Sequence, residues 1–201
     1  MLAAGRGHST VVAKLLEKGA DVSIQAADQN TALMLAAEGG HLATVKLLLK
    51  KSADPNQKNQ NGWTALFFSV VTDHPEIAER LLDEKAEVDI RDEEGMTPLL
   101  FAVANGRKAL VQSLLKGGAD VNFMGKGGIT PLMLTVENGH LDLAKILLTR
   151  GADVHAEVVT GETALTLATE RGDDKMIRLL KINLSKKNHG IKEGVDKTNE
   201  E

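Results

Sequence analysis

The feature that most constrains this chain is an internal repeat with a constant step of 33 residues. A threonine followed two residues later by a leucine recurs at this step, and a ladder of leucines from Leu15 to Leu180 keeps it as well. The threonines are Thr31, Thr64, Thr97, Thr130 and Thr163. A fixed period of about 20 to 50 residues is the signature of stacked repeats. We therefore expect a row of similar units instead of one globular core.

The unit that begins at Thr97 indicates how each repeat folds. Thr97 is placed to cap a helix, and Pro98 takes the first helical position, where a missing N–H group costs nothing. Apolar residues then fall on one face until Asn105-Gly106, and a second amphipathic helix ends at Gly118. Helices this short are unstable alone in water, so each pair must be stabilised by its neighbours.

Composition limits the chemistry that the chain can perform. Its 201 residues include no Cys, which excludes disulfides, thiolate nucleophiles and cysteine-based metal sites. The formal net charge of −4 is unfavourable for nucleic acid as a bulk property. The sequence has neither a run of about eighteen apolar residues nor the layout of a secretory signal, so no membrane association is expected. We expect a cytoplasmic location, with the nucleus as an alternative.

The unit resembles the ankyrin repeat in its Thr-Pro-Leu start, its Gly-His turn and its closing Gly-Ala-Asp-Val-Asn. These motifs stand at Thr97 and Thr130, at Gly40 and Gly139, and at Gly118. The resemblance implies an all-α ankyrin-repeat solenoid of stacked helix-turn-helix units with short hairpin-like connectors.

In the phase of the ankyrin family, an incomplete leading unit is followed by five further units. The ankyrin-repeat domain then covers residues 1–184, divided into 1–25, 26–58, 59–91, 92–124, 125–157 and 158–184. Residues 185–201 are polar and lack periodicity, so we expect a disordered tail there. In the leading unit, Leu2, Val11, Val12 and Leu15 look like interior residues that lack part of their cover. We therefore expect the chain to be a fragment of a longer repeat protein.

Several positions depart from the family pattern. The usual His after Thr-Pro-Leu is replaced in all five units, by Met34, Phe67, Leu100, Met133 and Thr166. We expect apolar contacts in place of the hydrogen bonds of that His. Ser52 and Lys85 stand at a helix-cap position held elsewhere by Gly, where a left-handed backbone costs each about 1 kcal/mol. Because Asp73-His74-Pro75 replaces the Gly-His turn, 59–91 is expected to be the least regular unit.

Residues with catalytic potential are better explained by the repeat than by chemistry. Four His residues share the position at the head of the second helix, which indicates a packing role and no metal cluster: His8, His41, His74 and His140. The acidic run Asp92-Glu93-Glu94 is expected to be a solvated edge, without the apolar pocket that raises the pKa of a general acid. We therefore predict no catalytic residue, no metal and no cofactor.

The predicted binding surface is the concave face, formed by the connector tips and the inner side of the first helices. Trp63, Met96 and Ile129 share one tip position in successive units, and Trp and Met are frequent anchors in interfaces. The polar residues of the predicted site are Gln60, Asn61, Glu93, Glu94, Lys126, Glu137, Asn138, Glu162 and Arg171. An alternative is that Trp63 packs over the neighbouring connector, onto Phe67.

These observations favour a monomeric, non-catalytic protein–protein interaction module, such as a scaffold, adaptor or targeting domain. Its partner would carry an apolar anchor with a basic rim. The alternative is the recognition arm of a longer enzyme or effector whose catalytic domain lies outside this chain. Nucleotide or nucleic-acid binding is disfavoured by the net charge and by the single stacking aromatic residue on the tips.

Overall fold

A computed structural model describes the backbone of residues 1–195 and the side chains of residues 1–185. The chain divides into two compact units, Met1–Asp120 and Val121–Glu201. Over residues 1–195 the structure contains twelve α-helices, one short 3-10 helix and two isolated β-bridges. The all-α repeat fold predicted from the sequence is confirmed.

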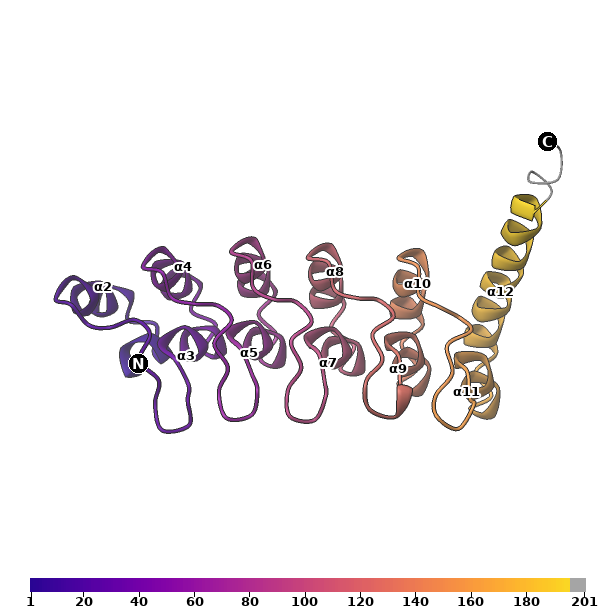
Figure 1. Ribbon diagram of the computed structural model, residues 1–201, viewed down its shortest axis with the longest axis horizontal. Helices are drawn as coiled ribbons and strands as arrows, with labels where there is room; N and C mark the ends of the chain where they lie inside the picture. The colour runs from indigo at the N-terminus through magenta and orange to yellow at the C-terminus, as the bar shows by residue number, and fades with distance from the viewer. Residues whose placement is uncertain (196–201) are drawn as a thin grey trace. The chain divides into compact units, whose positions relative to one another are not determined.

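The first unit contains four helix pairs arranged in two layers (Figure 1). The first helices of the pairs pack side by side in the order α1 (Leu2–Gly5), α3 (Ala32–Glu38), α5 (Ala65–Val71) and α7 (Pro98–Ala104). The second helices pack in the order α2 (Ser9–Glu17), α4 (Leu42–Lys50), α6 (Pro75–Asp83) and α8 (Lys108–Lys116). Connectors extend beyond the layer of first helices (Figure 1).

The second unit contains two further pairs. These are α9 (Pro131–Glu137) with α10 (Leu141–Thr149), and α11 (Ala164–Glu170) with α12 (Asp174–Val195), preceded by the 3-10 helix η1 (Lys126–Gly128). Helix α9 packs on α11, and α12 packs on α10 and α11. The prediction of a disordered tail is wrong for residues 185–195, because α12 continues through them. Residues 196–201 of that predicted tail lie outside the described residues.

Each predicted Thr cap forms. In every first helix from α3 to α11 the Thr hydroxyl accepts a hydrogen bond from the backbone N–H three residues later, at 3.2–3.3 Å. The residues that replace the usual His lie one turn into these helices, and Met34, Phe67, Leu100 and Met133 are buried. Phe67, Leu100 and Met133 make van der Waals contacts there, as predicted. The Sδ atom of Met34 also accepts a hydrogen bond from the Thr31 N–H at 3.4 Å. The prediction of apolar contact is wrong at Thr166, whose Oγ1 atom accepts a hydrogen bond from the Thr163 N–H at 2.7 Å.

The unit at 59–91 is as regular as its neighbours, contrary to our expectation. Helices α5 and α6 have 7 and 9 residues, as do α7 and α8. Asp73 adopts a φ of 62° in the turn, and Asp is among the residues that tolerate this region best. Ser52 and Lys85 both have a φ of 63°, so each adopts the left-handed backbone that Gly19, Gly118 and Gly151 have at the same repeat position.

The leucine ladder forms the centre of the layers. Within the first unit Leu48, Leu81 and Leu114 are no more than 1% exposed, whereas Leu15, at the same repeat position, is 49% exposed. Leu2 and Val11 are exposed beside it. The predicted lack of cover is therefore confirmed for Leu2, Val11 and Leu15, but it is wrong for Val12, which is only 6% exposed.

Candidate protein-binding surface

The tips of the five connectors share one backbone hydrogen bond. The N–H of the first tip residue donates to the carbonyl of the fifth at 2.9–3.0 Å, in the pairs Ala26–Asn30, Asn59–Trp63, Asp92–Met96, Gly125–Ile129 and Val158–Glu162. The fourth tip residue has positive φ, and it is Gly in four of the five tips. The repeat therefore sets the backbone of every tip in the same way.

In two of these tips the first residue also braces the backbone with its side chain. The Oδ1 atom of Asn59 accepts hydrogen bonds from the backbone N–H groups of Asn61 and Trp63, at 3.0 and 2.9 Å. The Oδ1 atom of Asp92 does the same for Glu94 and Met96, at 3.0 and 2.8 Å. Both tips belong to the first unit. Their side-chain braces hold the backbone around Trp63 and Met96 in place.

Neighbouring tips of the first unit are joined to each other. The N–H of Gln60 donates to the carbonyl of Asp28, and the N–H of Glu93 donates to the carbonyl of Asn61, both at 3.2 Å. The side-chain amide of Gln60 also donates to the carbonyl of Ala27 at 2.8 Å. These bonds align the tips side by side, so residues at equal tip positions lie next to one another.

Trp63 packs on its own repeat and touches the next one. Its ring stacks on Phe67 with centroids 5.1 Å apart and meets Phe68 edge-on at 5.3 Å. Its Nε1 atom donates to Oδ2 of Asp92 at 3.3 Å. The packing of Trp63 onto Phe67, left open by the sequence, is therefore present. Trp63 is nevertheless only partly buried, so it packs on the first helix and also leaves some of its surface exposed to solvent.

A hollow opens between the second and third tips of the first unit. Its volume is about 490 Å³, and its lining consists of Asn61, Trp63, Asp92, Glu93, Glu94, Met96, Phe101, Ala104 and Asn105. We call it the Trp63 hollow. Trp63, Met96 and Phe101 supply apolar surface, whereas Glu93 and Glu94 are exposed carboxylates.

Five of the residues predicted from the sequence line this hollow: Asn61, Trp63, Glu93, Glu94 and Met96. Gln60 lies outside the lining, because its amide is bonded to the preceding tip. The remaining predicted residues belong to the second unit, where Lys126, Glu137, Asn138 and Arg171 are exposed and Ile129 and Glu162 are partly buried. A binding line that continues from Met96 to Ile129 stays a prediction.

Sequence reasoning missed Asp92 and Phe101 as members of the site. Asp92 was expected to be solvated, but it is partly buried and accepts three hydrogen bonds. Its signal was its repeat position, because Asn59 stands 33 residues earlier and makes the equivalent bonds. Phe101 lies edge-on to Phe67 at 5.8 Å, and this contact has no signal in the repeat pattern.

The Trp63 hollow combines apolar surface with exposed carboxylates. In the part of the chain that the structure describes, no group of three or more His or acidic residues could hold a metal ion. None of the described helices is long and apolar enough to cross a membrane. An apolar floor beside exposed carboxylates complements an apolar side chain that has a cation next to it.

Comparison with known proteins identifies the class of this chain. A family model of ankyrin repeats in three copies matches residues 1–92, 51–124, 79–158 and 99–191. The chain therefore belongs to the ankyrin-repeat family, and ankyrin repeats are generally protein–protein interaction modules. A search of curated proteins found no significant match.

Proposed function

We propose that this chain is a non-catalytic module that binds a protein segment in the Trp63 hollow. The segment presents an apolar side chain with Lys or Arg beside it. The observation that carries the proposal is the combination of an apolar floor, formed by Trp63, Met96 and Phe101, with the carboxylates of Glu93 and Glu94.

The apolar floor supplies the larger part of the expected affinity. Trp is among the residues most often found as binding hot spots, and burial of one aliphatic side chain is worth about 1.5 to 3 kcal/mol. Glu93 and Glu94 are exposed, so their attraction for a cation is screened by salt. The carboxylates therefore contribute mainly to selection among segments and to the rate of association.

The braced tips favour binding because they limit the entropy lost on association. Asn59 and Asp92 each hold two backbone N–H groups of a tip, and Asp92 also accepts from the ring of Trp63. A surface that is ordered before binding loses less conformational freedom on association. We therefore expect the hollow to be pre-organised, so that its backbone moves little when a segment binds.

The experiment uses short peptides with one Leu or Ile between basic residues, and control peptides in which acidic residues replace the basic ones. Fluorescence anisotropy of the labelled peptides measures their Kd for the full chain. The expected result is saturable binding of the basic series only, with an affinity that falls as salt is raised. Equal binding of both series, or of neither, would contradict the proposal.

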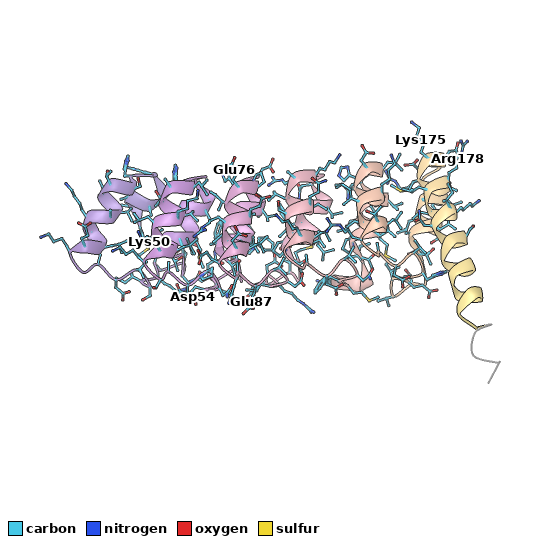
Figure 2. The ribbon with its side chains drawn as sticks, turned by 90° about the horizontal axis from the view of Figure 1, so that it is seen from above. Lys50, Asp54, Glu76, Glu87, Lys175 and Arg178 are labelled. Carbon is cyan, nitrogen blue, oxygen red and sulfur yellow. The ribbon has the colours of Figure 1, made fainter. Side chains whose placement is uncertain are left out.

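Charge reversal locates the binding. Glu93→Lys/Glu94→Lys should weaken the basic peptides at least about tenfold, because like charges then face each other. The matched control is Glu76→Lys/Glu87→Lys, which changes the net charge equally at exposed positions outside the lining of the hollow (Figure 2). Equal losses in the two variants would indicate a bulk charge effect and would rule out the hollow as the site.

A further inference from the structure

Helix α12 of the second unit has an exposed face of unusual composition. Lys175, Arg178 and Ile182 follow one another at i, i+3 and i+7, which places them on one side of the helix. All three are exposed, Ile182 by 54%, while Met176 and Leu180 are 0% and 1% exposed. Lys175 and Arg178 project outward from the first turns (Figure 2).

The charge of α12 differs from that of the whole chain. Its 22 residues include six Lys or Arg residues and two acidic residues, whereas the whole chain has a formal charge of −4. The other second helices have 9 residues each, and they are α2, α4, α6, α8 and α10. The last second helix is therefore longer, and it combines basic residues with an exposed aliphatic side chain.

This face has the chemistry that the Trp63 hollow complements. Ile182 is an exposed apolar side chain, and Arg178 and Lys181 are exposed cations within one turn of it. The hollow offers an apolar floor beside Glu93 and Glu94. Recognition of a helix by side chains at i, i+3 or i+4 and i+7 is a recurring mode of binding.

We propose that helix α12 of a second copy of this chain occupies the Trp63 hollow. Ile182 would contact Trp63 and Met96, and Arg178 would lie against the carboxylates of Glu93 and Glu94. This inference rests on the proposed function of the hollow and names one partner for it. It replaces the monomer expected from the sequence by a chain that associates with itself.

The contact joins two different surfaces, so it is heterologous. Each copy carries one hollow and one α12, and a heterologous contact that does not close into a ring extends into an open chain of copies. Self-association should therefore increase with protein concentration and weaken as salt is raised, because cations and carboxylates meet at the rim.

The test is sedimentation of the purified full chain from low micromolar to submillimolar concentration, with two variants that each remove one surface. Met96→Lys places a cation in the hollow, and Arg178→Ser/Ile182→Ser removes the basic and apolar side chains of the helix. Circular dichroism and the melting temperature confirm that each variant is folded. Each variant alone should remain a monomer and lose at least about tenfold in self-affinity.

Mixing the two variants is the decisive step. One variant keeps an intact α12 and the other an intact hollow, so the mixture should form a complex of one copy of each and stop there. A mixture that remains monomeric, although the unaltered chain associates, would overturn the inference.

A control addresses another exposed apolar residue that has Lys residues nearby. Leu15 is 49% exposed on α2, between Lys14 and Lys18. Leu15→Ser should leave self-association unchanged. If Leu15→Ser abolishes association while Arg178→Ser/Ile182→Ser does not, the inference is wrong.

Two further outcomes separate this inference from the proposed function. If the full chain stays monomeric throughout but still binds the basic peptides, the inference is overturned and the proposed function stands. If the monomeric chain instead sediments with anionic lipid vesicles through Arg178 and Ile182, the face serves a membrane surface and the inference is again overturned. Failure of both peptides and self-association would remove the proposed function as well.

Discussion

The connector tips at 59–63 and 92–96 differ from the tip at 125–129, although all three have the same backbone hydrogen bond. In the first two tips Asn59 and Asp92 accept the inner N–H groups. In the third tip this position is Gly125, which has no side chain to do so. The repeat therefore fixes the backbone path of a tip, whereas the residue type at the first tip position differs between repeats and decides which of these tips has the side-chain brace.

Aromatic residues reinforce this difference. Trp63, Phe67, Phe68 and Phe101 account for four of the five aromatic residues in the chain, and they contact one another in the first unit. The repeat equivalents of Trp63 and Phe67 in the 125–157 repeat are Ile129 and Met133. The tip at 59–63, at which we propose binding, thus combines a polar brace with a ring that packs on the first helix.

The largest expected effect comes from removing the seat of Trp63. Phe67 is fully buried, so Phe67→Ala should lower the free energy of unfolding by about 3 to 5 kcal/mol, measured by urea denaturation. The emission of Trp63 should also shift, because the ring loses its stacking partner. Met133→Ala, a comparable truncation in the second unit, should lower stability and leave that emission unchanged. An unchanged Trp63 emission in Phe67→Ala would show that stacking on Phe67 does not set the environment of the Trp63 ring.

The next effect concerns the brace itself. Asp92→Ala leaves the N–H groups of Glu94 and Met96 without their acceptor and should cost about 2 kcal/mol. Asp92→Asn keeps an acceptor oxygen, as Asn59 does, and should cost less than half as much. Amide hydrogen exchange at Glu94 and Met96 should accelerate in the Ala variant only. If Asn is as damaging as Ala, the charge of Asp92 matters more than its acceptor role.

A smaller effect of opposite sign is expected from adding a brace. Gly125 has φ −75° and ψ −167°, which any residue can adopt, so Gly125→Asp introduces the missing acceptor without backbone strain. We expect a gain of about 0.5 to 1 kcal/mol, from the new hydrogen bonds and from a less flexible unfolded chain. Urea denaturation measures the gain, and Gly125→Ala separates the two contributions. If Gly125→Asp raises the free energy of unfolding no more than Gly125→Ala does, the added side-chain acceptor does not stabilise the tip.

The smallest effect concerns the connector position occupied by Asn56, Asp89 and Asn122, each of which accepts a backbone N–H from the next connector. Burial raises the pKa of Asp89 above the ordinary value of 3.8, although the hydrogen bond from the Asp120 N–H lowers it in part. The folded protein therefore binds this proton more tightly than the unfolded chain, so stability decreases as pH rises from 3.8 through the raised pKa.

Asp89→Asn should remove this dependence and match the Asn residues of the other connectors. Its gain in stability over the parent should appear at neutral pH and disappear in acid, as measured by urea denaturation at both. A variant that gains equally at both pH values would show that titration of Asp89 has no part in the effect.

Much of the fold could be predicted because the repeat states the same local rules several times. Thr caps, the leucine ladder and the left-handed Ser52 and Lys85 all follow from position within the unit. The predicted irregularity at 59–91 failed because Asp73 adopts the turn conformation that Gly has elsewhere. The tail prediction failed over 185–195 because a helix already started at Asp174 continues with mainly polar residues.

The site was only partly predictable for a physical reason. Trp63 and Met96 were found from their shared tip position, which is a periodic property. The contacts of Asp92 with the Trp63 ring and of Phe101 with Phe67 join residues of different repeats, and they depend on how neighbouring units pack. Such contacts follow from side-chain shape in three dimensions and leave no period in the sequence.

The most direct test of segment binding in the Trp63 hollow uses Trp63, which is the only tryptophan of the chain. Acrylamide quenching of its emission is measured for the free chain and for the chain saturated with a basic peptide that carries one Leu or Ile. We expect the bound peptide to cover the exposed part of the ring and to lower the quenching constant, and we expect Glu93→Lys/Glu94→Lys to lose this protection. If a peptide binds and leaves the quenching of Trp63 unchanged, the hollow is not its binding site.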